Sequence, residues 1–293
     1  MNLEKIISNF LSHEQLEEKN IGIAVSGGID STVLLHLIAK CGNPDHVFVL
    51  HVHHGTRSVC DKEWYMVEKM CKTLHAHFIG KKLTSVPQKN VESAWRKERQ
   101  IFFEECKKNH KLERIFTAHH ATDLVETMIW RLTKGCGISG LSPFDISTKP
   151  LWNVPRSEIE KYAAKNHLIW CEDESNLNTN IERNLIRHEV LPKLRKITPN
   201  LEQVFVRESE IFHDASQFIG KHLPSLKPIE KKKFLELSPT IQTEFLRRIS
   251  KKTPSASEIE DCLRWINGNP KGGSHKSIGD TQIVFRDKVF SWK

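Results

Sequence analysis

The sequence of 293 residues predicts an α/β fold, in which a Rossmann-like domain with a parallel sheet precedes a smaller, mostly helical α+β region. Two observations lead to this prediction. Short apolar segments typical of strands alternate with longer amphipathic segments up to residue 132, which is the pattern of right-handed βαβ crossovers. Hydrophobic residues make up 38% of the chain and charged residues 27%, a composition that suits a folded core.

The elements of the first domain are predicted in order. Residues 1–20 form an amphipathic helix, because Leu3, Ile7 and Leu11 recur on one helical face. Strands are expected at residues 21–25, 47–52, 76–79 and 114–118, and helices at residues 32–39, 62–75, 91–109 and 122–132. Parallel strands end at one edge of a sheet, where such sheets bind ligands, so we expect the loops after the first, second and fourth strands to converge there.

The chain contains more loops after Gly135. Helices are expected at residues 157–165, 181–194, 201–223, 240–250 and 257–267, and a hairpin at residues 283–290 around Arg286-Asp287. Thr198-Pro199-Asn200 is typical of a break before a new helix. We therefore expect a catalytic domain of residues 1–199 and a C-terminal region of residues 200–293.

The segment Ser26-Gly27-Gly28-Ile29-Asp30-Ser31 lies between a predicted buried strand and a predicted helix. Backbone N–H groups and the positive end of a helix dipole meet in such a loop, which suits a phosphate group. A carboxylate beside phosphate is repulsive unless a cation lies between them, so we infer Mg²⁺ at Asp30. The alternative is that Asp30 and Ser31 only cap the helix.

This loop is not the P-loop of kinases, because no Gly-Lys-Ser/Thr follows. It resembles the pyrophosphate loop of the N-type ATP pyrophosphatases, which cleave ATP between the α- and β-phosphates. The resemblance implies ATP and Mg²⁺ as cofactors, bound by residues 26–31. A later segment, Gly135 to Gly140, matches Gly-x-Gly-x-x-Gly, but it follows a helix and we reject a dinucleotide site there.

Asp123 and Glu126 lie three residues apart on a predicted helix, and His119 and His120 precede them. Two carboxylates on one face could hold a metal ion or an ammonium group. The alternative is a solvated acidic face at a helix N-terminus. We favour a functional role because the pair follows a strand beside the predicted ATP loop.

Two basic segments could contact polyanions, in agreement with the net charge of +8 and the pI near 9.1. Arg96 and Arg99 share a helical face with Glu92 and could clamp phosphates, although salt bridges within the helix explain this segment as well. A second stretch could follow an RNA backbone or be an ordinary surface helix. Its basic residues are Arg183, Arg187, Lys193, Arg195 and Lys196.

The order and spacing of seven segments resemble the tRNA(Ile)-lysidine synthetases. They are residues 26–31, 54–57, 92–99, 119–127, 135–141, 149–151 and 172–192. The resemblance covers about two-thirds of the chain. It implies that ATP adenylates C2 of the wobble cytidine in an isoleucine tRNA with anticodon CAU. The ε-amine of free L-lysine then displaces AMP, and decoding changes from AUG to AUA.

The resemblance also implies roles for individual residues. Asp123 and Glu126 match the acids that bind lysine, and Arg96 matches a catalytic position. His54 and Arg57 match nucleotide-binding positions. Substrate binding is expected at Glu92, Arg99, His119, His120, Arg183 and Arg187. The chain departs from the family pattern at His53, Thr56, Thr122 and Leu124, where family members usually carry Asp, Leu, Asp and Gln.

Other functions remain open at this point. A tRNA thiolase would need a cysteine pair, but the seven cysteines are scattered and none forms Cys-x-x-Cys. A small-molecule synthetase would not need the basic stretch, and a tRNA-binding protein without activity would not need the intact loop. Free cysteines indicate a reducing cytoplasm, and no apolar run reaches membrane-spanning length, so we expect no membrane partner. A homodimer is compatible with the sequence, which does not fix the oligomeric state.

Overall fold

The computed structural model describes residues 1–53, 55, 59–83, 91–172, 181–250 and 252–293. The chain divides into two compact units. The first consists of Met1–Val125 and Phe144–Gln203, and the second of Glu126–Pro143 and Val204–Lys293. Each unit is described by itself below.

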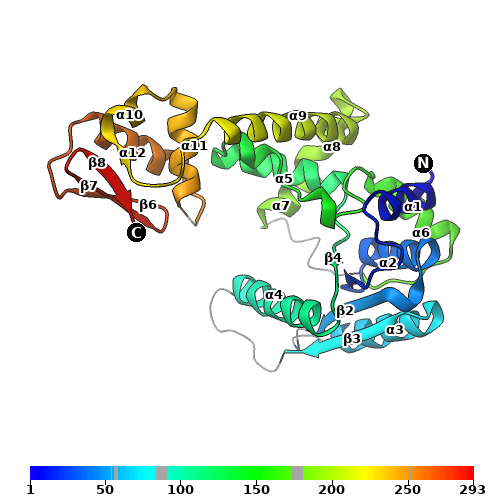
Figure 1. Cartoon of the computed structure of the whole chain (residues 1–293). Helices are drawn as coiled ribbons and strands as arrows, with labels where there is room; N and C mark the ends of the chain where they lie inside the picture. The colour runs from blue at the N-terminus through cyan, green and yellow to red at the C-terminus, as the bar shows by residue number, and fades with distance from the viewer. Residues whose placement is uncertain (54, 56–58, 84–90, 173–180, 251) are drawn as a thin grey trace. The chain divides into compact units, whose positions relative to one another are not determined.

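The first unit contains the predicted parallel sheet (Figure 1). Its strands are β1 (Ile21–Ala24), β2 (Val47–His53), β3 (His77–Lys82) and β4 (Arg114–Phe116). Their order is β3-β2-β1-β4, and every neighbouring pair is parallel. The central strand β1 therefore pairs with β2 on one side and β4 on the other, so the segments that follow these three strands leave the same edge of the sheet.

The helices that accompany the sheet lie close to their predicted positions. They are α1 (Leu3–His13), α2 (Ile29–Cys41), α3 (Val59–Leu74), α4 (Val91–Asn109), α5 (Ala121–Lys134) and α6 (Arg156–Lys165). Short 3₁₀ turns occur at η1 (Pro44–His46), η2 (Ile138–Leu141) and η3 (Ile146–Thr148). The helices that follow are α7 (Glu182–Leu185), α8 (Leu191–Ile197) and α9 (Leu201–His222).

Alternation along β2 divides the core between the two faces of the sheet. Val47 and Val49 pack in the cluster that contains the apolar face of α1 and the buried residues of α2. Leu50 packs in the other cluster, with Phe102 and Cys106 of α4. The parallel sheet is therefore covered on both faces, as expected for βαβ units.

The first helix is shorter than predicted, because α1 ends at His13 and not near residue 20. Gln15 adopts a φ of 55°, which a helix cannot continue through. The N–H of Leu16 then donates to the Leu11 carbonyl, and Leu16 is itself buried. A hydrophobic contact after a left-handed residue is a common way to end a helix.

The helix predicted at 181–194 extends from Glu182 to Ile197 and contains a π-helical segment, Ile186–Val190. Pro192 follows this segment. Because proline has no N–H and its ring crowds the carbonyl four residues earlier, a regular α-helix could not continue here without loss. The wider π turn accommodates the proline.

A close contact fixes β3 against α3. A Cβ atom on Gly80 would lie 2.1 Å from Cη2 of the Trp64 ring, so only glycine fits beneath that ring. Trp64 also stacks edge-on against Phe78.

The second unit combines helices with a four-stranded antiparallel sheet of order β5-β8-β7-β6. Its helices are most of α5 and α9 together with α10 (Lys231–Glu236), α11 (Pro239–Ile249) and α12 (Ala256–Asn267). The strands are β5 (Ile229–Glu230), β6 (His275–Ile278), β7 (Thr281–Arg286) and β8 (Val289–Trp292). The predicted hairpin is β7–β8, although its turn falls one residue later, at Asp287 and Lys288, which both have positive φ.

Within the described part of the chain, no helix is long and apolar enough to cross a bilayer. All seven cysteines are free thiols, as the sequence predicts.

Candidate active site

The predicted phosphate loop connects the end of β1 to the start of α2. Gly27 has a φ of 99°, in the region that favours glycine, and a Cβ there would lie 3.3 Å from Glu63. Gly28 is the N-cap of α2 and offers no side chain for capping. The N–H groups of the first helical turn have no partner within the helix and face the loop with the positive end of the dipole. This local geometry confirms the predicted strand, loop and helix.

The two serines of the loop hydrogen-bond within it. The Ser31 hydroxyl donates to the Gly28 carbonyl at 3.0 Å, and the Ser26 N–H donates to Ser31 Oγ at 3.2 Å. The Gly28 N–H donates to Ser26 Oγ at 3.3 Å. These bonds fix the shape of the loop before a ligand is bound.

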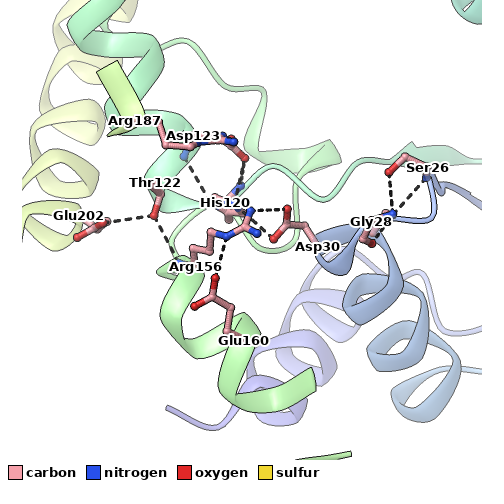
Figure 2. A network of polar contacts seen from close by, with 11 residues as sticks. Ser26, Gly28, Asp30, His120, Thr122, Asp123, Arg156, Glu160, Arg187 and Glu202 are labelled. Atoms are coloured by element: carbon pink, nitrogen blue, oxygen red, sulfur yellow. Dashed lines mark hydrogen bonds and ion pairs between the residues drawn. The ribbon is translucent and has the colours of Figure 1, made fainter. Parts of the chain in front are cut away.

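Asp30 does not cap the helix; its carboxylate lies among charged side chains of other elements (Figure 2). Arg156 Nη1 donates to Oδ2 at 3.0 Å, and His120 Nε2 lies 3.5 Å from Oδ1. Burial raises the pKa of Asp30 above its usual value, against the opposing effects of His120 and Arg156. Oδ1 is buried and has no hydrogen-bond partner. An unpartnered carboxylate oxygen beside a phosphate loop is a fitting ligand for Mg²⁺, which binds through one or two carboxylates together with phosphates.

His120 connects the loop to α5. Its Nδ1 accepts the Asp123 N–H at 3.3 Å, so the ring proton is on Nε2. That Nε2 lies 3.5 Å from Asp30 Oδ1 and 3.5 Å from Asp123 Oδ2. The imidazole is only 1% exposed. One buried ring therefore lies between the carboxylate of the phosphate loop and the carboxylate of the predicted amine site.

The two predicted acids of α5 are not a solvated acidic face. Asp123 accepts from the His120 N–H at 3.1 Å and from Arg187 Nη2 at 3.2 Å. Burial alone would raise the pKa of Asp123, but His120, His119 and these hydrogen bonds hold it below its usual value. Glu126, one turn later on the same helix, is 1% exposed. A part-buried, ionised Asp123 is a group that can bind a cation.

His119 is neutral at physiological pH, because burial lowers its pKa to about 4 and Lys149 and Arg183 add to this effect. Its Nδ1 is 2.8 Å from Thr117 Oγ1, and its ring lies edge-on to Phe144. A neutral imidazole has one nitrogen that can accept a proton, and the ring becomes a cation when it does so.

Arg156 and Glu202 belong to this network but were not among the predicted site residues. The Arg156 N–H donates to Thr122 Oγ1 at 3.5 Å, and the Thr122 hydroxyl donates to Glu202 at 3.3 Å. Arg195 also donates to Glu202 through Nε at 3.2 Å. The Thr122 hydroxyl therefore serves as donor and acceptor at once.

Arg187 was predicted to bind an RNA backbone, and its contact with RNA stays a prediction. Its guanidinium pairs with Asp123, an acid 64 residues earlier in the sequence. Two further basic residues of the same stretch have acidic neighbours, Arg195 with Glu202 and Lys193 with Glu189. Arg183 is exposed. Arg187, Lys193 and Arg195 therefore each have an acidic partner in the fold.

Several predicted residues are not brought into the network. Arg96 and Arg99 are exposed side chains on α4, and their contact with a substrate stays a prediction. His54, Arg57, Thr56 and the side chain of Glu92 lie outside the described residues. Over the ranges that the structure describes, no cluster of three His, Cys, Asp or Glu side chains could hold a metal ion on its own.

His53, one of the departures from the family pattern, ends β2 and makes a polar contact through each ring nitrogen. Its Nδ1 accepts the Gly55 N–H at 3.1 Å, as a carboxylate at this position could, and its Nε2 lies 3.1 Å from Asp61. Leu124, another of these departures, is fully buried in the structure.

Comparison with known proteins places this geometry in a family. The PP-loop domain family matches residues 1–194. The chain is 32% identical over 233 residues to a tRNA(Ile)-lysidine synthase of Histophilus somni, covering 75% of this chain and 53% of the relative. The chain thus spans about half the length of that relative and of others like it. It is also 32% identical to a tRNA(Ile)-lysidine synthase of Petrotoga mobilis over 296 residues, which is 94% of each chain.

Among solved structures, a U34-tRNA thiolase from Methanococcus maripaludis, with its [4Fe-4S] cluster, superposes with a TM-score of 0.60 at 15% identity. The match covers 72% of this chain and 78% of the thiolase, and it shows the fold alone. The matched residues 1–194 contain the phosphate loop, Asp30, His120 and Asp123, and the Petrotoga relative matches over nearly its whole length. The chain belongs to the PP-loop domain family and, within it, to the tRNA(Ile)-lysidine synthases.

Proposed function

We propose that this protein uses ATP to ligate free L-lysine to C2 of the wobble cytidine of an isoleucine tRNA with anticodon CAU. One observation carries the proposal: His120 Nε2 lies 3.5 Å from both Asp30 and Asp123. This arrangement places the phosphate loop beside an ionised acid that suits an ammonium group. An activated carbonyl and an attacking amine must meet at such a place.

In the first half-reaction, the C2 oxygen of cytidine attacks the α-phosphorus of ATP and pyrophosphate leaves. The backbone N–H groups of residues 26–31 would hold the phosphates. Asp30 would hold Mg²⁺ through its unpartnered Oδ1. When bound, the ion supplies neutralisation of the charge that develops on the leaving pyrophosphate.

In the second half-reaction, the lysine ε-nitrogen attacks C2, and AMP leaves with the former C2 oxygen. Asp123, whose carboxylate is held ionised, would bind the ammonium form together with Glu126. The amine must lose a proton before it attacks. Asp123, in the first turn of α5, and the neutral His119, just before α5, could accept that proton.

The tRNA would lie against the exposed basic residues. Arg183 is exposed next to the site, and Arg96 and Arg99 are exposed on α4. We assign the C-terminal region of residues 200–293 to tRNA binding as well, and we place the protein in the cytoplasm, where tRNA is modified. Substitution of Arg183 by Ala should make the dependence of tRNA affinity on salt concentration shallower.

Release of pyrophosphate in the absence of lysine tests the proposal. The purified protein should release pyrophosphate from ATP with an unmodified isoleucine tRNA transcript that carries C at the wobble position. A matched transcript that carries U there should release none. Release without any tRNA, or with ammonia and a small carbonyl compound, would instead support a small-molecule synthetase.

A further inference from the structure

Arg156 is a cationic residue that contacts the phosphate loop, and the proposed mechanism gives it no role. It is the first residue of α6, directly after Pro155 at the N-cap. Its Nη1 donates to Asp30 Oδ2 at 3.0 Å, and its Nε donates to Glu160 at 3.0 Å (Figure 2). The side chain is 34% exposed, so it reaches both the buried carboxylate and the solvent.

Two acids thus hold the guanidinium next to the phosphate loop. Glu160 lies one turn later on the same helix and fixes Nε, and the Arg156 N–H is anchored on Thr122. A guanidinium fixed at Nε has a defined plane and can present its other nitrogens to a planar or tetrahedral oxyanion. Arginine is always charged, so its charge does not depend on the state of Asp30.

The Arg156 guanidinium pairs with the Asp30 carboxylate, which is also the group that would bind Mg²⁺. The Asp30 side chain is 27% exposed and its Oδ1 is buried, so a charged carboxylate here needs a positive partner. Arg156 supplies that positive charge in the ligand-free protein. When Mg²⁺ and ATP occupy the loop, the ion satisfies Asp30 and the phosphates bring several negative charges within reach of Arg156.

We propose that Arg156 contacts the phosphates of ATP, exchanging Asp30 for a phosphate oxygen when Mg²⁺–ATP binds. This inference rests on the proposed use of ATP and adds a phosphate-binding residue to it. Glu160 keeps the guanidinium in place during the exchange through Nε. The alternative is that Arg156 only neutralises Asp30 and never touches the nucleotide.

A double-substitution experiment separates these two roles. Affinity for α,β-methylene-ATP with Mg²⁺ is measured by calorimetry for the full chain and for R156Q, R156K, D30N and D30N/R156Q. If Arg156 binds phosphate, R156Q should weaken binding about tenfold or more, and R156K by less, because lysine keeps the charge and loses the fork. The same loss of about tenfold should appear when R156Q is added to D30N.

If Arg156 only neutralises Asp30, R156Q should have no effect in the D30N background, and this result would overturn the inference. The double variant also leaves no unpaired buried charge, so it stays informative if R156Q alone does not fold. K161Q is the matched control, because Lys161 is an exposed cation of the same helix that pairs with Glu158. It should bind the nucleotide as the unsubstituted protein does.

Repeating the titration in EDTA gives a second readout. Without Mg²⁺, Arg156 should remain held by Asp30, so R156Q should weaken the residual binding by less than it does with Mg²⁺. A loss of equal or greater size in EDTA would contradict the exchange. An unsubstituted protein that binds no nucleotide at all would overturn the proposed function itself, and this outcome is distinct from the loss of Arg156's role alone.

Discussion

Substitution of Asp123 by Asn tests whether the buried acid of α5 binds the lysine amine. The change keeps the size of the side chain and one oxygen, and removes the charge. Asp123 accepts from the His120 N–H at 3.1 Å and from Arg187 at 3.2 Å, and its side chain is 16% exposed. The amide can replace only part of these contacts, because its NH₂ group cannot accept.

The size of the effect follows from the loss of one charge-assisted contact to the ammonium. Such a contact contributes on the order of 1.5–3 kcal/mol, which corresponds to roughly a ten- to a hundredfold change. We therefore expect the KM for lysine to rise by about that factor. The phosphate loop and Asp30 remain intact, so release of pyrophosphate with tRNA and ATP should fall much less.

The assay measures the two half-reactions separately, as tRNA-dependent pyrophosphate release and as lysine incorporation at varied lysine concentration. E189Q is the matched control, because Glu189 is an exposed acid in the neighbouring π-helical segment. It should change neither half-reaction. If Asp123→Asn abolishes pyrophosphate release and leaves the KM for lysine unchanged, Asp123 acts on the nucleotide and the assignment is wrong.

Three further predictions concern stability. Burial lowers the pKa of His119 from 6.5 to about 4, so the unfolded chain takes up a proton at this residue before the folded protein does as the pH falls below 6.5. The free energy of unfolding should therefore fall by about 2 kcal/mol between pH 7 and 5. The melting temperature of His119→Gln should fall less over that range, and an equal fall would contradict the lowered pKa. Gly80→Ala should cost about 1–3 kcal/mol or more because of the indole ring 2.1 Å from the new Cβ, whereas Gly272→Ala meets nothing within 4 Å and should melt near the original temperature; similar melting of both would refute the contact. Thr122→Asp should lower the melting temperature, because it places a carboxylate beside Glu202, and adding Glu202→Gln should restore part of that temperature. A Thr122→Asp variant that melts with the original protein, or a double variant that melts no higher than Thr122→Asp, would contradict the contact between residues 122 and 202.

Local patterns predicted most of the first unit. Residues 21–24 are apolar and mostly buried, and Gly27 and Gly28 allow the tight turn that follows them. The strand, the loop and the helix after it were therefore predicted together. The end of a helix was predicted wrongly where a contact outside the helix determines it. The end of α1 at His13 depends on burial of Leu16, which the helical periodicity of residues 1–20 does not reveal.

The parts of the site that were missed are long-range contacts between charged groups. Arg156 lies 126 residues after Asp30, and neither residue's neighbours indicate the pair. Arg187 shows the same limit, since a run of basic residues gives no sign that an acid from α5 lies beside one of them. Pro155 indicates that a helix starts next to it. This was the sequence signal that could have drawn attention to Arg156 in the first turn of that helix.

The second unit was predicted less fully for a different reason. The hairpin β7–β8 has clear alternation, but β6 has the sequence His275-Lys276-Ser277-Ile278 and buries only its last residue. A strand with one buried side chain carries no periodic signal. Its pairing with β7 is what defines it.

The most direct measurement of the central claim is the mass of the wobble nucleoside after reaction. The purified protein is incubated with ATP, Mg²⁺, L-lysine and an isoleucine tRNA transcript with anticodon CAU, and the digested nucleosides are analysed by mass spectrometry. One cytidine should gain the mass of lysine less one water, in an amount equal to the AMP formed. Unchanged cytidine, with ATP consumed or not, would contradict this claim.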